Sequence, residues 1–263
     1  VEDPLEDTGS LDEAMDRLPV LARLSYTNTG EFLAGQFDIL IQHFIEGVQM
    51  RNQQGLNVTN DVSNGLKIVE GKLAWLVRMV SAIIGGARAQ DSKGEDEQNN
   101  LIIDGRLCNY IFILVGYIND IYNQQANQNK NDIDLVDEKL EFAILGFFKS
   151  FKKVYLLESM SESSRRYVEG APISDSGSLL GLALRTMKGD TSLLNTLDID
   201  GNENGGKESS IKTIYEAMEQ QFSSSNLVMN LIIEKVCNDI KFWNDDDSML
   251  QMTLEVFVDL VSS

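Results

Sequence analysis

The chain has 263 residues, 43% of them hydrophobic and 24% charged, which is enough to bury one sizeable core or two small ones. Its formal net charge of −19 disfavours nucleic acid, whose phosphates it would repel, and favours partners with basic protein surfaces. The longest apolar stretch, 73–87, contains Arg78 and falls short of the ~20 residues that span a bilayer, so no membrane insertion is expected.

Apolar residues recur at helical spacing along most of the chain, and convincing strands are absent. The predicted helices are 10–25, 29–51, 64–85, 100–124, 135–157, 209–222, 226–243 and 247–261. Polar stretches rich in turn-forming residues separate them. Consecutive helices, such as 10–25 and 29–51 or 64–85 and 100–124, are predicted to form antiparallel pairs.

The helix predicted at 29–51 has two apolar sides and one polar side. Its main apolar stripe is Leu33, Phe37, Leu40, Ile41, Phe44 and Val48. Phe32, Ile39 and His43 form a second packed side, and Glu31, Asp38, Gln42 and Glu46 form the polar side. Because a surface helix needs one apolar stripe, two stripes predict neighbours on two sides.

The helix predicted at 64–85 shows the same two-sided pattern most strongly. One stripe is Leu66, Val69, Leu73, Leu76, Val77, Val80, Ile83 and Ile84, and a second is Trp75, Met79 and Ala82. In 135–157, aromatic residues of the apolar stripe are expected to fill the gap between adjacent repeats, with Lys149, Lys152 and Lys153 exposed. Helices covered on two sides are typical of a stacked array of helix hairpins.

Two stretches interrupt the helical pattern. The Asn/Gln run 123–131 is predicted to be a disordered tip between helices. Residues from about 158 to 206 are rich in Ser and Gly and are predicted to form a long flexible insert. The prediction is therefore an all-α solenoid in which 1–263 is a single segment with one inserted loop.

Catalytic and metal-binding patterns are missing. The one histidine, His43, lies mid-helix without a nucleophile motif, and Cys108, Cys237 and His43 are too few for a structural zinc site. Residues 200–205 imitate the start of a calcium loop, but Ile211 stands where a bidentate Glu is required. We therefore predict no enzyme activity, metal or cofactor.

The cysteines and the first residues indicate a compartment. Cys108 and Cys237 lie in apolar helical patterns, which favours free buried thiols in a reducing compartment. The first residues are acidic and polar, unlike a secretory signal, so the sequon at Asn57 is expected to be unmodified. A start without methionine and an end directly after an apolar helix lead us to expect a segment of something longer.

Four segments, in order, resemble the exportin branch of the importin-beta superfamily of nuclear transport receptors. They are VEDPLEDT (1–8), EGKLAWLVRMVSAIIGGAR (70–88), EKLEFAILGFFKSFKKVY (138–155) and IIEKVCNDIKFW (232–243). The resemblance implies an alpha-solenoid of HEAT-type antiparallel helix hairpins. It departs from the family pattern at the insert, 158–206.

The resemblance also implies a function. Such a receptor carries protein cargo through the nuclear pore, contacts nucleoporins, requires Ran in its GTP state, and shuttles between nucleus and cytoplasm. The principal Ran contacts would lie in first repeats that this segment lacks. No family motif assigns a cargo or Ran contact to a residue of this sequence.

Two alternatives stay open on the sequence alone. A helical-repeat scaffold or regulatory subunit of a protein complex would show the same two-sided helices and the same lack of catalytic motifs. Glu31, Asp38 and Glu46 share one side of a helix, which gives the hypothesis of a partner-binding surface. The alternative for these three residues is an ordinary solvated helix face.

Overall fold

The computed structural model describes residues 8–54, 60–86, 95–127, 136–156 and 225–261. These residues are helical throughout apart from short connections, and they contain no strand. The helices are α1 (Thr8–Arg23), α2 (Tyr26–Gln54), α3 (Asn60–Gly85), α4 (Glu95–Asn127), α5 (Glu138–Phe151), α9 (Ser225–Phe242) and α10 (Asp247–Val261), and α5 continues into a π-helical turn, η2 (Lys152–Leu156). The predicted all-α class is confirmed.

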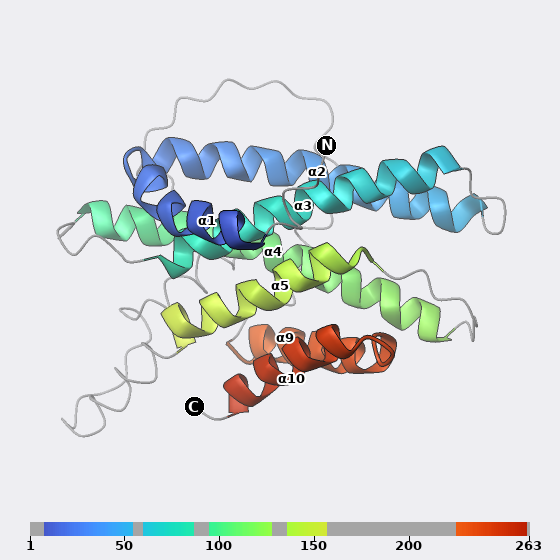
Figure 1. Ribbon diagram of the computed structural model, residues 1–263. Coiled ribbons are helices and arrows are strands. Elements are labelled where there is room, and N and C mark those ends of the chain that lie inside the picture. The colour runs from blue at the N-terminus through green and yellow to red at the C-terminus, as the bar shows by residue number, and fades with distance from the viewer. Residues whose placement is uncertain (1–7, 55–59, 87–94, 128–135, 157–224, 262–263) are drawn as a thin grey trace.

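The helices form two layers (Figure 1). In one layer α1 lies beside α3, α3 beside α5, and α5 beside α10. In the other, α2 lies beside α4 and α4 beside α9. Contacts between α2 and α3, and between α9 and α10, join the two layers. Consecutive helices therefore alternate between layers, which is the arrangement of stacked helix hairpins in a solenoid.

Local sequence explains several helix starts. The Asp137 carboxylate accepts a hydrogen bond from the backbone N–H of Lys139 at 2.9 Å and caps α5. Asp246 does the same for α10, where its carboxylate accepts the N–H of Met249 at 2.9 Å. Each cap pairs a backbone donor that the first helical turn otherwise leaves without a partner.

The two-sided helix α3 lies at the centre of the first layer. Leu73, Val77 and Val80 on its main stripe are fully buried. Trp75 and Met79 on its second side are partly buried and pack against the same core. Because α1, α2 and α5 all contact α3, the prediction of neighbours on two sides is confirmed for this helix.

Aromatic side chains fill the space between hairpins, as predicted for α5. The Phe112 ring on α4 meets the rings of Phe147 and Phe151 on α5 edge to face, with centroids 5.5 and 5.1 Å apart. Further along α4, Tyr110 stacks on Phe37 of α2 at 5.5 Å. Such pairs add to the stability that simple burial gives.

The predicted second packed side of α2 is wrong. The side chains of Phe32 and Ile39 are 65% and 51% exposed, and His43 is exposed as well. α2 lies at one end of its layer, so none of the described helices covers this side (Figure 1). The sequence pattern shows that the side is apolar, but not whether a neighbour is present.

Two smaller predictions also need correction. Cys108 is buried as expected, but Cys237 is exposed, because it lies on the outer side of α9. The Asn/Gln run 123–131, predicted to be a disordered tip, is helical as far as Asn127. The Asn123 amide donates a hydrogen bond to Glu234 of α9 at 2.8 Å. The insert predicted at 158–206 and the helix predicted at 209–222 lie outside the described residues.

Phe37 and Phe32 lie on opposite sides of α2 and give a matched pair of substitutions. Phe37→Ala removes a fully buried ring and should lower the free energy of unfolding by about 3–5 kcal/mol. Phe32→Ala removes an exposed ring and should change it by less than about 0.5 kcal/mol. Urea unfolding followed by circular dichroism measures both, and equal losses would contradict this orientation of α2.

Candidate interaction surfaces

Within the described residues, no three metal-binding side chains gather into a possible metal site. His43 is exposed on α2. Burial raises the pKa of the Cys108 thiol well above its ordinary value, which keeps it protonated and unreactive. The calcium-like residues 200–211 and Asn57 lie outside the described residues. The described helices include none long and apolar enough to cross a membrane.

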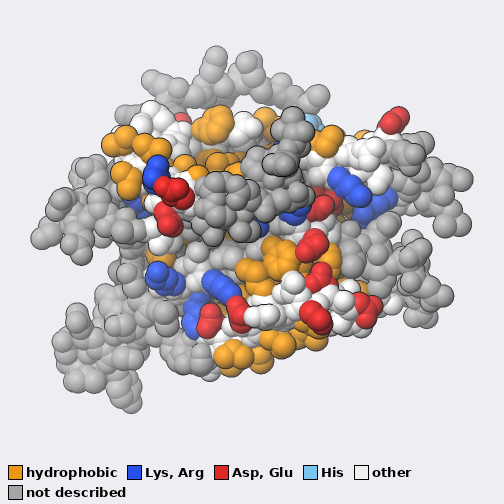
Figure 2. Space-filling view, in the orientation of Figure 1, with side chains coloured by type: hydrophobic (Ala, Val, Ile, Leu, Met, Phe, Trp, Pro, Cys, Tyr) orange, Lys and Arg blue, Asp and Glu red, His pale blue; other side chains and the backbone are white. Residues whose placement is uncertain are grey.

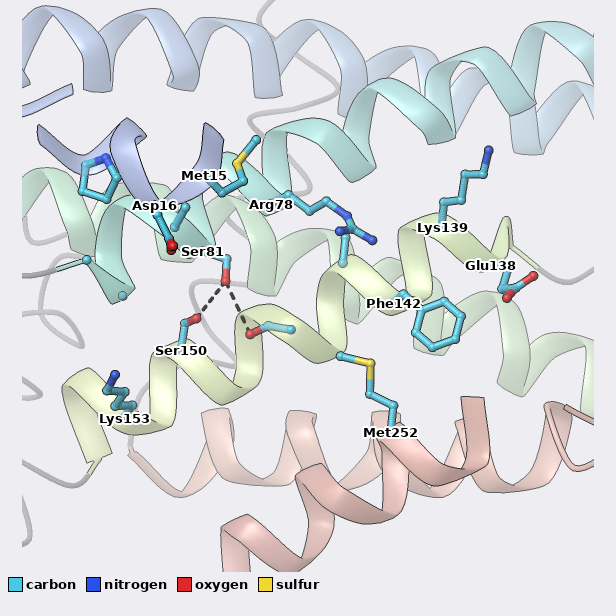
Figure 3. A pocket seen from close by; sticks show the side chains of 16 residues that line it. Met15, Asp16, Arg78, Ser81, Glu138, Lys139, Phe142, Ser150, Lys153 and Met252 are labelled. Atoms are coloured by element: carbon cyan, nitrogen blue, oxygen red, sulfur yellow. Dashed lines mark hydrogen bonds between the residues drawn. The ribbon is translucent and has the colours of Figure 1, made fainter. Parts of the chain in front are cut away.

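A groove of about 870 Å³ crosses the first layer, between α1, α3, α5 and α10 (Figure 3). Small residues form much of its floor, including Gly85 at the end of α3, Gly86 directly after it and Gly146 of α5. The Ser81 hydroxyl lies within donating distance of two acceptors on α5, the Ser150 hydroxyl at 2.9 Å and the Gly146 carbonyl at 3.4 Å. Because these side chains are small, α3 and α5 approach closely and leave a hollow above them.

The groove has an apolar wall and a rim of mixed charge. Met15, Phe142 and Met252 supply apolar surface from three helices (Figure 3). The charged lining residues are three cations and two carboxylates, namely Arg78, Lys139, Lys153, Asp16 and Glu138. The lining contains neither histidine nor cysteine. Apolar surface surrounded by charges of both signs makes the groove a candidate surface for contact with another protein segment.

The outer side of α10 is a second candidate surface. Apolar side chains that are 40–64% exposed follow one another at helical spacing, and these are Leu254, Phe257, Val258 and Val261. Figure 2 shows apolar side chains along the lower edge of the molecule, where Figure 1 draws α10. The Lys149 ammonium, 2.7 Å from the Glu255 carboxylate, ties this side of α10 to α5. That hydrogen bond lowers the pKa of Glu255 below its usual range.

A buried cluster of charges joins α4, α5 and α9, and the sequence analysis missed it. The Lys235 ammonium contacts the carboxylates of Glu141 and Asp239, and all three side chains are fully buried. Tyr122 donates its hydroxyl hydrogen to Glu141 at 2.5 Å and accepts a hydrogen bond from the Trp243 indole at 3.4 Å. The cluster is inside the stack, so its role is to hold helices together rather than to meet a partner.

The surroundings of this cluster shift two pKa values. Burial raises the pKa of Asp239 to about 7, with nearby Lys235 acting against the shift and Glu141 adding to it. Burial alone would lower the pKa of Lys235, but the two carboxylates outweigh it and raise that pKa. One sequence signal was available, because Lys235 and Asp239 follow Val228 and Ile232 at the helical spacing of buried positions.

The acidic residues predicted to share one side of α2 differ in exposure. Glu31 and Glu46 are exposed, whereas Asp38 is half-buried and already has an interaction. The Gln42 amide donates a hydrogen bond to Glu46 at 2.9 Å. Two of the three carboxylates are therefore accessible to a partner.

The model of one protein family, described as "Exportin-7-like, TPR domain", matches residues 1–263. The chain belongs to this exportin-7-like family. The predicted family resemblance is thereby confirmed over the whole sequence.

Individual relatives agree with the family match. The chain is 26% identical over 260 residues to Exportin-7-B of Xenopus laevis, which covers 99% of this chain and 18% of that protein. It is 28% identical over 167 residues to Ran-binding protein 17 of Homo sapiens, covering 64% of this chain and 13% of that protein. The chain thus spans less than a fifth of the length of these relatives. No solved structure matches significantly.

The exportin-7-like family description names TPR, whereas the sequence analysis predicted HEAT-type hairpins. Both repeat types are antiparallel helix pairs that stack into a solenoid, and the described helices have this common architecture. A helix at the end of such a stack shows an apolar side that a further hairpin would cover. The exposed sides of α2 and α10 have this character.

The exposed side of α10 can be tested with a dye that fluoresces on apolar surface. The double substitution Leu254→Glu with Val258→Glu should reduce the fluorescence of bound anilinonaphthalene sulfonate, because both side chains are about half exposed. Far-UV circular dichroism should stay unchanged. The control is Val256→Glu, a buried position on the same helix, which should disrupt folding. Unchanged dye binding by a folded double variant would contradict the exposure of this side.

Proposed function

We propose that the chain is a segment of a nuclear export receptor, which carries protein cargo through the nuclear pore and depends on Ran in its GTP state. The match of the exportin-7-like family to residues 1–263 is the observation that carries this proposal. The two-layered helix stack supports it, because stacked hairpins give extended surfaces for binding proteins. No step of catalysis is part of the proposed role.

The proposed partners are Ran, protein cargo and nucleoporins. Relatives from Homo sapiens, Mus musculus and Drosophila melanogaster are named Ran-binding proteins. Because the net charge of the chain is −19, we propose that its cargo presents basic surfaces. The main Ran contacts would lie in repeats outside this segment, and the receptor would shuttle between nucleus and cytoplasm.

The organisation of the segment is part of the same proposal. Residues 1–263 would form one stretch of solenoid, with about 158–206 as an insert. The single family match over 1–263 and the continuous layers of described helices support one stretch rather than two domains. A helical-repeat scaffold of a protein complex would share these features, but the family match favours transport.

Binding to Ran distinguishes a transport receptor from a scaffold. Ran loaded with GTP should capture the full-length protein from solution more strongly than Ran loaded with GDP. The 263-residue chain alone should bind Ran weakly or not at all, because the proposed Ran contacts lie elsewhere. Equal capture by both nucleotide states would argue against transport. Tight binding by the 263-residue chain would show that main Ran contacts lie within this segment, contrary to the proposal.

The acidic side of α2 can be tested by charge reversal in the full-length protein. If this side attracts basic cargo, Glu31→Lys with Glu46→Lys should weaken cargo capture in a pull-down, since both carboxylates are exposed. The control, Asp245→Lys with Asp247→Lys, changes net charge equally at exposed positions away from α2 and outside the groove. Weaker cargo capture with the Glu31 and Glu46 substitutions alone supports a role of this surface in cargo binding. Unchanged capture, or equal loss with both pairs, contradicts it.

A further inference from the structure

Helix α9 joins α4 through a seam of polar side chains. The Asn119 amide of α4 donates a hydrogen bond to the Leu231 carbonyl at 3.3 Å. The same Asn119 accepts one from the Asn238 amide of α9 at 3.1 Å. Both amide side chains are buried, so polar groups in the interior contribute to the attachment of α9.

The buried cluster of Lys235, Glu141 and Asp239 lies beside this seam. It contains one cationic side chain and two carboxylates, all three fully buried. With both carboxylates ionised the cluster would hold one uncompensated negative charge, and burying such a charge is costly. Uptake of one proton removes that charge without moving any helix.

The groups that face Asp239 come from three helices. Lys235 is on its own helix, Glu141 is on α5, and Tyr122 is on α4. The ammonium lies 5.4 Å from the centroid of the Tyr122 ring, which adds a cation–π contact. The titratable side chains of α10 do not face the cluster, since all of them are exposed, and these are Asp247, Glu255 and Asp259.

We propose that the junction of α9 with α4 and α5 is a proton-controlled joint, in which protonation of Asp239 holds α9 and α10 more firmly on the stack. The proton neutralises the excess negative charge of the cluster and leaves the Lys235 contact with Glu141 intact. Opening of α9 exposes Asp239 to water, where a carboxylate loses its proton readily. The docked and opened forms therefore bind different numbers of protons.

The sign of the pH dependence follows from this difference. The pKa of Asp239 is about 7 when docked and has an ordinary value of 3.8. The docked form keeps the proton up to a higher pH, so the stabilisation is fully present below about pH 4 and is lost as pH rises through 7. Between these limits each unit of pH should change the opening equilibrium by up to about tenfold.

Hydrogen exchange measured by mass spectrometry tests the joint on the whole 263-residue chain. After correction for the intrinsic pH dependence of exchange, the protection of α9 amides should rise by roughly 20-fold from pH 7.5 to 5.5. Asp239→Asn replaces the titrating group with a neutral one. This variant should show high protection in α9 at pH 7.5 and little change at lower pH.

The control is Asp245→Asn, at an exposed position after α9, and it should keep the wild-type pH slope. If the slope in Asp239→Asn equals that of the wild type, Asp239 is not the controlling group and the proposal fails. If Asp239→Asn does not fold, the wild-type chain decides alone. Protection of α9 that stays flat or falls between pH 7.5 and 5.5 overturns the proposal.

Discussion

Burial on two sides of each inner helix is the constraint on which the rest of the structure depends. A helix inside a stack of hairpins has neighbours along its own layer and across the gap between layers, so one apolar stripe is not enough. α3 meets this condition, with α1 and α5 beside it and α2 across from it. α5 repeats the arrangement between α3 and α10, and its fully buried Phe147 reaches α4. Because α1, α2 and α10 each pack against α3 or α5, the positions of these two helices restrict where the other three can lie.

Buried polar contacts between hairpins fix the register of neighbouring helices, which apolar stripes alone do not fix. An apolar stripe can slide along its neighbour by one helical turn and still bury similar area. A buried hydrogen bond cannot, because the slip would leave a polar group without its partner. Tyr26 of α2 donates to buried Asp104 of α4, and Lys235 of α9 contacts Glu141 of α5. We infer that these contacts fix the relative positions of hairpins that the apolar core holds together.

The sequence predicts the helices well because two-sided periodicity is a local property. α3 and α10 begin and end within a few residues of their predicted positions. What periodicity cannot supply is the identity of the neighbour on each side. Phe32 of α2 and Trp75 of α3 have similar sequence surroundings, yet one is 65% exposed and the other packs on the core. Helical spacing indicates that Lys235 lies on the buried side of α9, but it cannot reveal the partner Glu141, which lies on a different helix.

The candidate groove could not be predicted from the sequence, because small side chains on several helices create it and no binding motif marks it. Gly85, Gly86 and Gly146 look like ordinary positions of apolar helices, and no residue type among them suggests binding. A side chain added at Gly86 would collide with Pro19 of α1, whose ring lies 2.3 Å from the position of the added carbon. The glycine therefore permits the close approach of α1 to the end of α3, beside the hollow that small side chains of α3 and α5 leave. The groove follows from how the hairpins stack, whereas the proposed role in transport rests on family membership. Evidence against one of these two proposals would therefore leave the other unchanged.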